Sequence, residues 1–130
     1  MIILTIRTDQ PTAEIGLFND DKKLAYKSWQ AHRQLAETIH AQISRLLKSQ
    51  KLDWQNIEGI VCFKGPGSFT GLRIGLSIGN ALAYSLNVPI VSAMDEDWMQ
   101  EGLRVLKGGK NETIVLPEYG SPVNITLPKK

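Results

Sequence analysis

The chain has 130 residues, of which 42% are hydrophobic and 22% charged, and its formal net charge is +2 at pH 7. This composition is that of an ordinary folded domain, so it excludes a chain that is disordered throughout. The 15 basic residues are scattered, which argues against a dedicated nucleic-acid-binding stripe. No apolar run approaches the roughly 20 residues that span a bilayer, and "MIILTIRT" lacks the features of a secretion signal. We therefore expect a cytoplasmic protein without membrane contact.

Three consecutive strands are predicted at the start of the chain. Residues Ile2–Thr8 are β-branched and apolar, as in a buried strand, and Thr12–Asn19 alternates between apolar and polar residues. A third strand, Lys22–Gln30, follows a short turn rich in Asn and Asp. Links this short predict an antiparallel meander.

The spacing of apolar residues then changes to that of a helix. Leu35, Ile39 and Ile43 lie on one face of a predicted amphipathic helix between His32 and Ser49. The stretch "KLDWQNI" after it predicts a loop, in which Asp53 caps a short turn.

A strand–helix–strand unit follows. Glu58–Gly65 and Val88–Ser92 read as buried parallel strands, and the glycine-bearing helix Ser68–Leu86 connects them. A third helix is predicted over Asp95–Leu106, and Thr113–Leu116 reads as a strand before a proline-containing tail. The chain therefore divides into an α/β subdomain at 1–107 and a short strand with a tail at 108–130.

Small residues recur every four positions along the central helix. Gly71, Gly75, Gly79 and Ala83 form one stripe, while Leu72 lies on another sector. Three glycines cost about 3 kcal/mol of helix propensity, which indicates a specific packing demand. The stripe fits either close packing against the chain's own first helix or a surface offered to another protein.

The glycine-rich turn before this helix does not match the common nucleotide motifs. "GPGSFTG" lacks the Gly-Lys-Ser/Thr of a P-loop, and its glycines are spaced G-x-G-x-x-x-G rather than G-x-G-x-x-G. Free amides at a helix start can still hold an anion, so anion binding remains open.

The residues that could supply other chemistry are few. A nucleophile and a base could be assigned to Ser68 or Cys62 and to His32 or His40, but no pattern in the sequence supports that pairing. No cluster of acidic or histidine side chains predicts a metal site. The single cysteine reads as a small buried hydrophobe. We predict no catalytic residue, no metal and no cofactor.

The nineteen residues "GPGSFTGLRIGLSIGNALA" resemble the signature of the TsaB (YeaZ) family, bacterial partner subunits in tRNA threonylcarbamoyladenosine modification. The resemblance extends from Met1 to about Ser92. It implies an actin/Hsp70/sugar-kinase-like (ASKHA) α/β subdomain with a mixed sheet, an antiparallel N-terminal meander and a βαβ crossover.

The same resemblance implies a non-catalytic scaffold that pairs through its first two helices with TsaD. That subunit transfers threonylcarbamoyl to N6 of the adenosine next to the anticodon. By position, the interface would comprise Leu35, Ile39, Ile43, Gly71, Leu72, Gly75, Gly79 and Ala83. The turn Gly65, Pro66, Gly67, Ser68, Phe69 and Thr70 would set the angle at which the helix begins. A TsaE-like ATPase is a further candidate partner, tRNA would be contacted only indirectly, and the chain alone would form a homodimer.

The sequence departs from the family in two places. Arg7-Thr8-Asp9 stands where members have Asp-Thr-Ser, which weakens the case for ATP hydrolysis. Only about 38 residues follow Ser92, which we interpret as a natural minimal form that lacks most of the second subdomain and keeps the tail. The alternatives are a small actin-fold nucleotide-binding protein, with ATP at Arg7–Thr12 and Ser68–Thr70, and a homodimeric interaction module.

Overall fold

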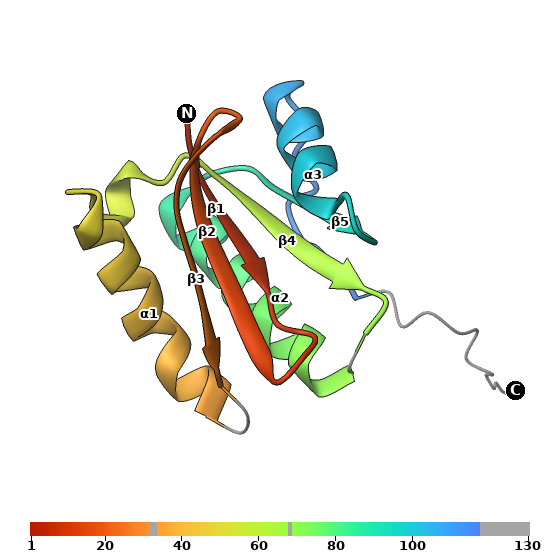
Figure 1. Ribbon diagram of the computed structural model, residues 1–130. Coiled ribbons are helices and arrows are strands. Elements are labelled where there is room, and N and C mark those ends of the chain that lie inside the picture. Colours follow the sequence, from red (N-terminus) through yellow and green to blue (C-terminus); the bar gives the residue numbers. More distant parts are fainter. Residues whose placement is uncertain (32–33, 68, 118–130) are drawn as a thin grey trace, which may run out of the picture.

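A computed structural model describes residues 1–31, 34–67 and 69–117. Its centre is a five-stranded sheet with the order β3-β2-β1-β4-β5 (Figure 1). The strands comprise β1 Ile2–Arg7, β2 Thr12–Asn19, β3 Lys22–Gln30, β4 Gly59–Gly65 and β5 Ile90–Met94. Within the part of the chain described, no helix is long and apolar enough to cross a membrane.

The first three strands form the predicted antiparallel meander, and β1, β4 and β5 run parallel. The short turn between β2 and β3 permits only antiparallel pairing, whereas helix α2 (Phe69–Leu86) provides the crossover that parallel β4 and β5 require. The predicted mixed α/β sheet is confirmed.

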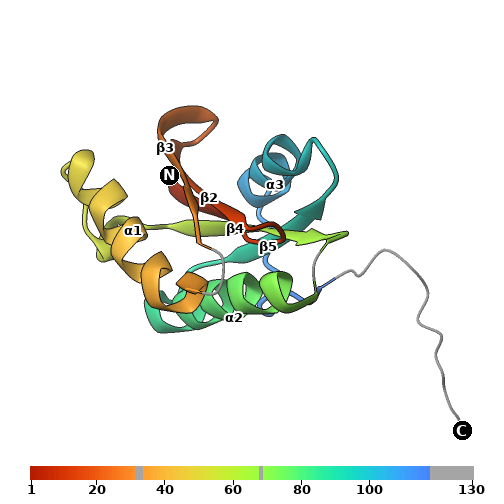
Figure 2. The ribbon, with the colours of Figure 1, turned by 60° about the horizontal axis from the view of Figure 1, so that its bottom comes forward.

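The helices divide between the two faces of the sheet. Helices α1 (Leu35–Ser49) and α2 cover one face, and α3 (Trp98–Lys107) covers β4 and β5 on the other (Figure 2). A 3-10 turn, η2 (Trp54–Asn56), follows α1, and the Asp53 N–H donates to Asn56 Oδ1 at 2.7 Å.

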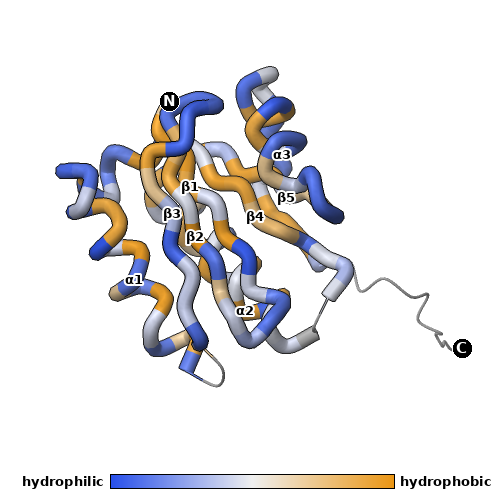
Figure 3. The backbone as a smooth tube through the Cα atoms, in the orientation of Figure 1, coloured by the Kyte–Doolittle hydropathy of each residue, from blue (hydrophilic) through white to orange (hydrophobic). Residues whose placement is uncertain are grey.

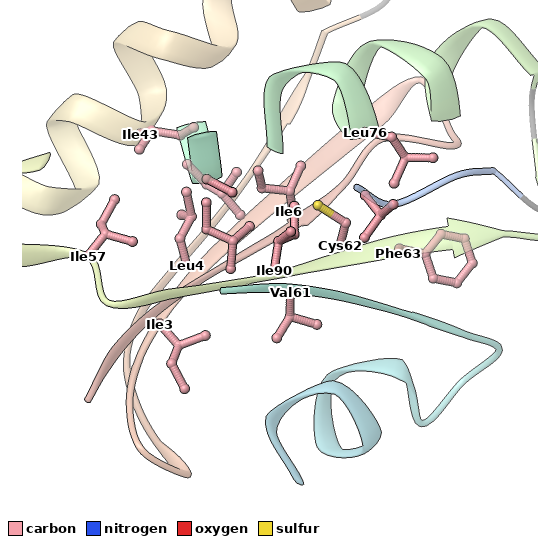
Figure 4. Packing of buried hydrophobic residues seen from close by; sticks show 14 of the residues in the cluster. Ile3, Leu4, Ile6, Ile43, Ile57, Val61, Cys62, Phe63, Leu76 and Ile90 are labelled. Atoms are coloured by element: carbon pink, nitrogen blue, oxygen red, sulfur yellow. The ribbon is translucent and has the colours of Figure 1, made fainter. Parts of the chain in front are cut away.

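Apolar side chains of the central strands fill the space beneath the helices. In the close view, Leu4, Ile6 and Cys62 lie between the sheet and the α1–α2 layer, with Ile43 and Leu76 above them (Figure 4). Along the backbone, the hydrophobic segments follow β1 and β4, while α1 alternates between hydrophobic and hydrophilic stretches (Figure 3). Apolar residues that recur every two positions in the strands and every 3.6 positions in the helices therefore lie where the sheet and the helices pack together.

The predicted starts of two elements are shifted. Strand β5 begins at Ile90 rather than Val88, and α3 begins at Trp98 rather than Asp95. Asp95 has a φ of 68°, a left-handed conformation that cannot continue a helix. Residues 32 and 33, where the first helix was expected to begin, lie outside the described residues.

The strand expected over Thr113–Leu116 does not form. Thr113 has a φ of 69°, which is incompatible with a strand. The segment is held by side chains instead: Asn80 of α2 exchanges two hydrogen bonds with the backbone of Val115, at 2.8 and 3.1 Å. Just before it, Glu112 accepts two hydrogen bonds from Ser92, both 2.8 Å, at the edge of β5. The proline-containing tail expected beyond Pro117 lies outside the described residues.

Candidate functional site

A groove of about 550 Å³ runs between α1 and α2 on the outer side of the helical layer. Helix α1 contributes Ala36 and His40, and α2 contributes the rest of the lining, Thr70, Arg73, Ile74, Ser77 and Ile78. Both isoleucines are only half-buried, although apolar β-branched side chains at this spacing usually pack fully. The groove is therefore a surface suited to a second apolar element.

The apolar residues predicted as the interface part of α1 lie beneath the helix rather than on its outer surface. Leu35 is 5% exposed, and Ile39 and Ile43 are fully buried. They attach α1 to β2 and β3. They can therefore position the helix for a partner but cannot themselves contact one.

The glycine stripe of α2 faces the chain's own sheet. A Cβ on Gly71 would collide with the Thr8 carbonyl, and one on Gly75 would collide with the Thr8 side chain. A Cβ on Gly79 would lie 2.5 Å from Cys62 Sγ. The expectation that these glycines accommodate a neighbouring helix is corrected: they let α2 lie directly on β1 and β4.

The other two α2 residues expected at the interface are also covered. Leu72 is fully buried and Ala83 is 4% exposed. The surface that α2 presents outward instead includes Arg73, Ser77, Ala81 and Tyr84, the last of which is 91% exposed. No interface role was predicted for Ile74 and Ile78 from the sequence. Their four-residue spacing was the signal that could have indicated a second apolar strip.

The glycine-rich turn holds α2 against the end of β1. Gly65 has a φ of 125°, which favours glycine, and a Cβ on Gly67 would meet the Asp9 side chain. The Thr8 hydroxyl donates to the Gly71 carbonyl oxygen at 2.7 Å. Thr70 is exposed at the rim of the α1–α2 groove, and Ser68 lies outside the described residues.

Arg7 and Asp9, which depart from the family motif, form an ion pair with each other at this turn. Arg7 Nε donates to Asp9 Oδ1 at 2.7 Å, and the Asp9 side chain is only 5% exposed. The hydrogen bond to Asp9 raises the pKa of Arg7, against a smaller opposing effect of burial. The guanidinium also lies 4.0 Å from the centre of the Phe63 ring, which in turn contacts Trp98. Each charge therefore already has a partner within the chain.

This arrangement does not favour the nucleotide-binding alternative. The Asp9 carboxylate lies against Gly67, where a bound phosphate would approach the turn, and like charges repel. Burial raises the pKa of the Cys62 thiol to about 12, so it stays protonated and is a poor nucleophile. Within the described residues, His, Cys, Asp and Glu side chains form no group able to hold a metal.

Comparison with known proteins identifies relatives that agree with the resemblance seen in the sequence. The family model described as "TsaD: tRNA N6-adenosine threonylcarbamoyltransferase" matches residues 29–105. The chain is 36% identical over 91 residues to the tRNA threonylcarbamoyladenosine biosynthesis protein TsaB of Bacillus subtilis (strain 168), covering 69% of this chain and 39% of that protein. It is 43% identical over 61 residues to the tRNA N6-adenosine threonylcarbamoyltransferase of Geotalea daltonii, covering 47% and 18% of the two chains.

A solved structure supports the same fold. YeaZ from Pseudomonas aeruginosa superposes with a TM-score of 0.66 at 23% identity, over 72% of this chain and 44% of that one. The actin-like α/β fold is thereby confirmed. The chain spans less than half the length of the TsaB and YeaZ relatives that it matches.

Proposed function

This chain belongs to the TsaD/TsaB (YeaZ) family of tRNA threonylcarbamoyladenosine proteins, and from that premise we propose that it is a non-catalytic partner subunit. It pairs with a TsaD-like protein and supports transfer of the threonylcarbamoyl group to N6 of the adenosine next to the anticodon. The observation that carries the proposal is the α1–α2 groove with its half-buried isoleucines.

The similarity to both kinds of relative supports pairing through this groove. The chain is similar to a TsaB protein over 91 residues and to a threonylcarbamoyltransferase over 61 residues. Two chains with a shared fold can associate through the same patch on each, as in an isologous dimer. A helical layer from the partner would then pack against α1 and α2 and cover Ile74 and Ile78. The same surface would let the chain form a homodimer when the partner is absent.

The chemistry of the described residues supports an accessory role. The thiol of Cys62 is buried with a raised pKa, and Arg7 and Asp9 are bound to each other. A TsaE-like ATPase remains a candidate third component, and a cytoplasmic site of action follows from the tRNA substrate.

The molar mass measured by light scattering after size-exclusion chromatography tests the pairing. We expect an equimolar complex when the chain is mixed with the TsaD-like protein of the same organism. In a transfer assay, the chain alone should give no modified tRNA, and adding it to the TsaD-like protein should raise the yield. A chain that elutes as an unchanged monomer in the mixture, or that modifies tRNA alone, would contradict the proposal.

A further inference from the structure

A second, smaller groove lies between β3 and α1, at the edge of the sheet. Its volume is about 250 Å³, and Lys27, Gln42, Arg45, Leu46 and Ser49 line it. In Figure 1 this region lies where α1 runs beside the outermost strand. It is separate from the α1–α2 groove, with which it shares no lining residue.

The fold brings two cations together that are 18 residues apart in the sequence. Trp29 of β3 points toward α1, because its indole N–H donates to Thr38 Oγ1 at 3.1 Å. Lys27, two residues earlier on the strand, therefore points to the same side. Arg45, which lines the groove, is exposed on the last half of α1, and Lys48 is exposed one turn further along the helix.

No described carboxylate neutralises these cations. The ion pairs of the described residues join the N-terminus to Asp20 and Glu58, Arg7 to Asp9, and Arg104 to Glu101. Glu37 on the same helix is eight residues from Arg45, about 12 Å along the axis.

The neighbouring strand brings no acid to the groove either. Glu14 of β2 accepts a hydrogen bond from the Tyr26 hydroxyl at 2.8 Å, and Tyr26 alternates with Lys27 along β3. Glu14 therefore lies on the opposite face of the sheet.

Structural roles explain part of this arrangement. A lysine on an edge strand discourages pairing with other sheets, and Lys48 complements the dipole at the end of α1. Neither role requires Arg45 and Lys27 in one groove, where their like charges repel. A polyanion would remove that repulsion.

We propose that this basic groove, with the polar lining residues Lys27, Gln42 and Arg45, contacts the phosphate backbone of RNA. Arg, Lys and Gln are the side chains that commonly contact phosphates, and none of these contacts depends on base sequence. The choice of RNA over another polyanion rests on the proposed function in tRNA modification. The chain would then touch tRNA directly as well as through its partner, unlike the sequence-based expectation.

Salt dependence of RNA binding tests the groove. The probe is a fluorescein-labelled, unmodified tRNA transcript, titrated with the equimolar complex or, where that does not form, with the chain alone. Each phosphate contact contributes about one unit to the slope of log K against log salt. Lys27→Ala/Arg45→Ala should therefore reduce that slope by about two units.

A matched control carries the same change of net charge at another place. Lys107→Ala/Lys110→Ala removes two exposed cations, one at the end of α3 and one three residues after it, and α3 lies on the face of the sheet opposite to α1 (Figure 2). This variant should bind RNA with a nearly unchanged slope. Equal effects of both double variants would show a non-specific charge effect and would overturn the proposal.

Two further readouts separate the possible outcomes. Displacement of the tRNA by polyglutamate as effectively as by unlabelled RNA would show a surface for acidic protein and would overturn the RNA assignment. Light scattering of Lys27→Ala/Arg45→Ala with the TsaD-like protein should give an unchanged complex. A missing wild-type complex contradicts the proposed function, whereas an unchanged slope in the double variant contradicts the RNA contact.

Discussion

Substituting Gly75 by alanine tests directly which way the glycine stripe faces. In a helix open to solvent, alanine would stabilise the chain by about 1 kcal/mol. Here the new methyl group would collide with the Thr8 side chain, whose Cγ2 and Cβ would lie 3.0 and 3.1 Å away. Overpacking of this kind costs about 1–3 kcal/mol.

Relief of this collision has a further cost. Moving Thr8 breaks the 2.7 Å hydrogen bond from its hydroxyl to the Gly71 carbonyl oxygen. Leaving the hydroxyl of the buried Thr8 without a partner costs about 1–3 kcal/mol. After the gain in helix propensity, Gly75→Ala should lower the free energy of unfolding by about 1–5 kcal/mol.

Urea denaturation followed by circular dichroism provides the measurement, with the m-value as a check on two-state behaviour. Ser77→Ala, on the exposed side of the same helix, is the control and should change the free energy of unfolding by less than about 0.5 kcal/mol. Because Thr8→Ala removes Oγ1 and Cγ2, the two Thr8 atoms nearest the new methyl group, the Thr8→Ala/Gly75→Ala double variant should lose less than the two single variants combined. A more stable Gly75→Ala chain would refute the packing described here.

Three other predictions concern stability. Glu112→Ala should cost about 1–3 kcal/mol, measured by urea denaturation, because the Ser92 N–H and hydroxyl at the edge of β5 lose their acceptor. Arg7→Ala leaves the Asp9 carboxylate buried without its cation and should cost about 3 kcal/mol by the same measurement, whereas Arg7→Ala/Asp9→Ala should recover most of the loss. The folded pKa of Cys62, about 12, is raised above its ordinary value of 9.0, so stability from this group is complete below pH 9 and is lost as the pH rises toward 12. Unfolding free energies measured across this range should fall less steeply for Cys62→Ala than for the parent chain.

The sequence predicted β2 and β3 to the residue, and β1 one residue too long, because two local signals agree there. Apolar residues alternate along β2, and the Asn-Asp-Asp turn fixes where β2 ends and β3 begins. Strand β5 was placed two residues early because Val88 and Pro89 are apolar in the same way as the residues that follow. The pairing of β5 with β4 begins at Ile90, opposite Ile60, and the Ile90 N–H donates to Asn111, a contact 21 residues away.

The candidate site was predicted less well than the fold. Helical spacing showed that Gly71, Gly75 and Gly79 share a face, but periodicity cannot say whether that face meets the sheet or another chain. Their contacts with Thr8 and Cys62 come from the crossover that places α2 over β1 and β4. The groove between Lys27 and Arg45 could not be predicted from the sequence either. The cations are scattered along the chain, and only the fold brings these two together.

The central claim is that the chain docks on a TsaD-like partner through the α1–α2 groove, and one pair of variants tests it most directly. Ser77→Arg places a bulky cation in the groove, and Ser85→Arg places the same side chain at an exposed position of α2 outside it. Calorimetric titration with the TsaD-like protein should show at least about tenfold weaker binding for Ser77→Arg and near-parent affinity for Ser85→Arg. Unchanged affinity for a folded Ser77→Arg variant would contradict the claim.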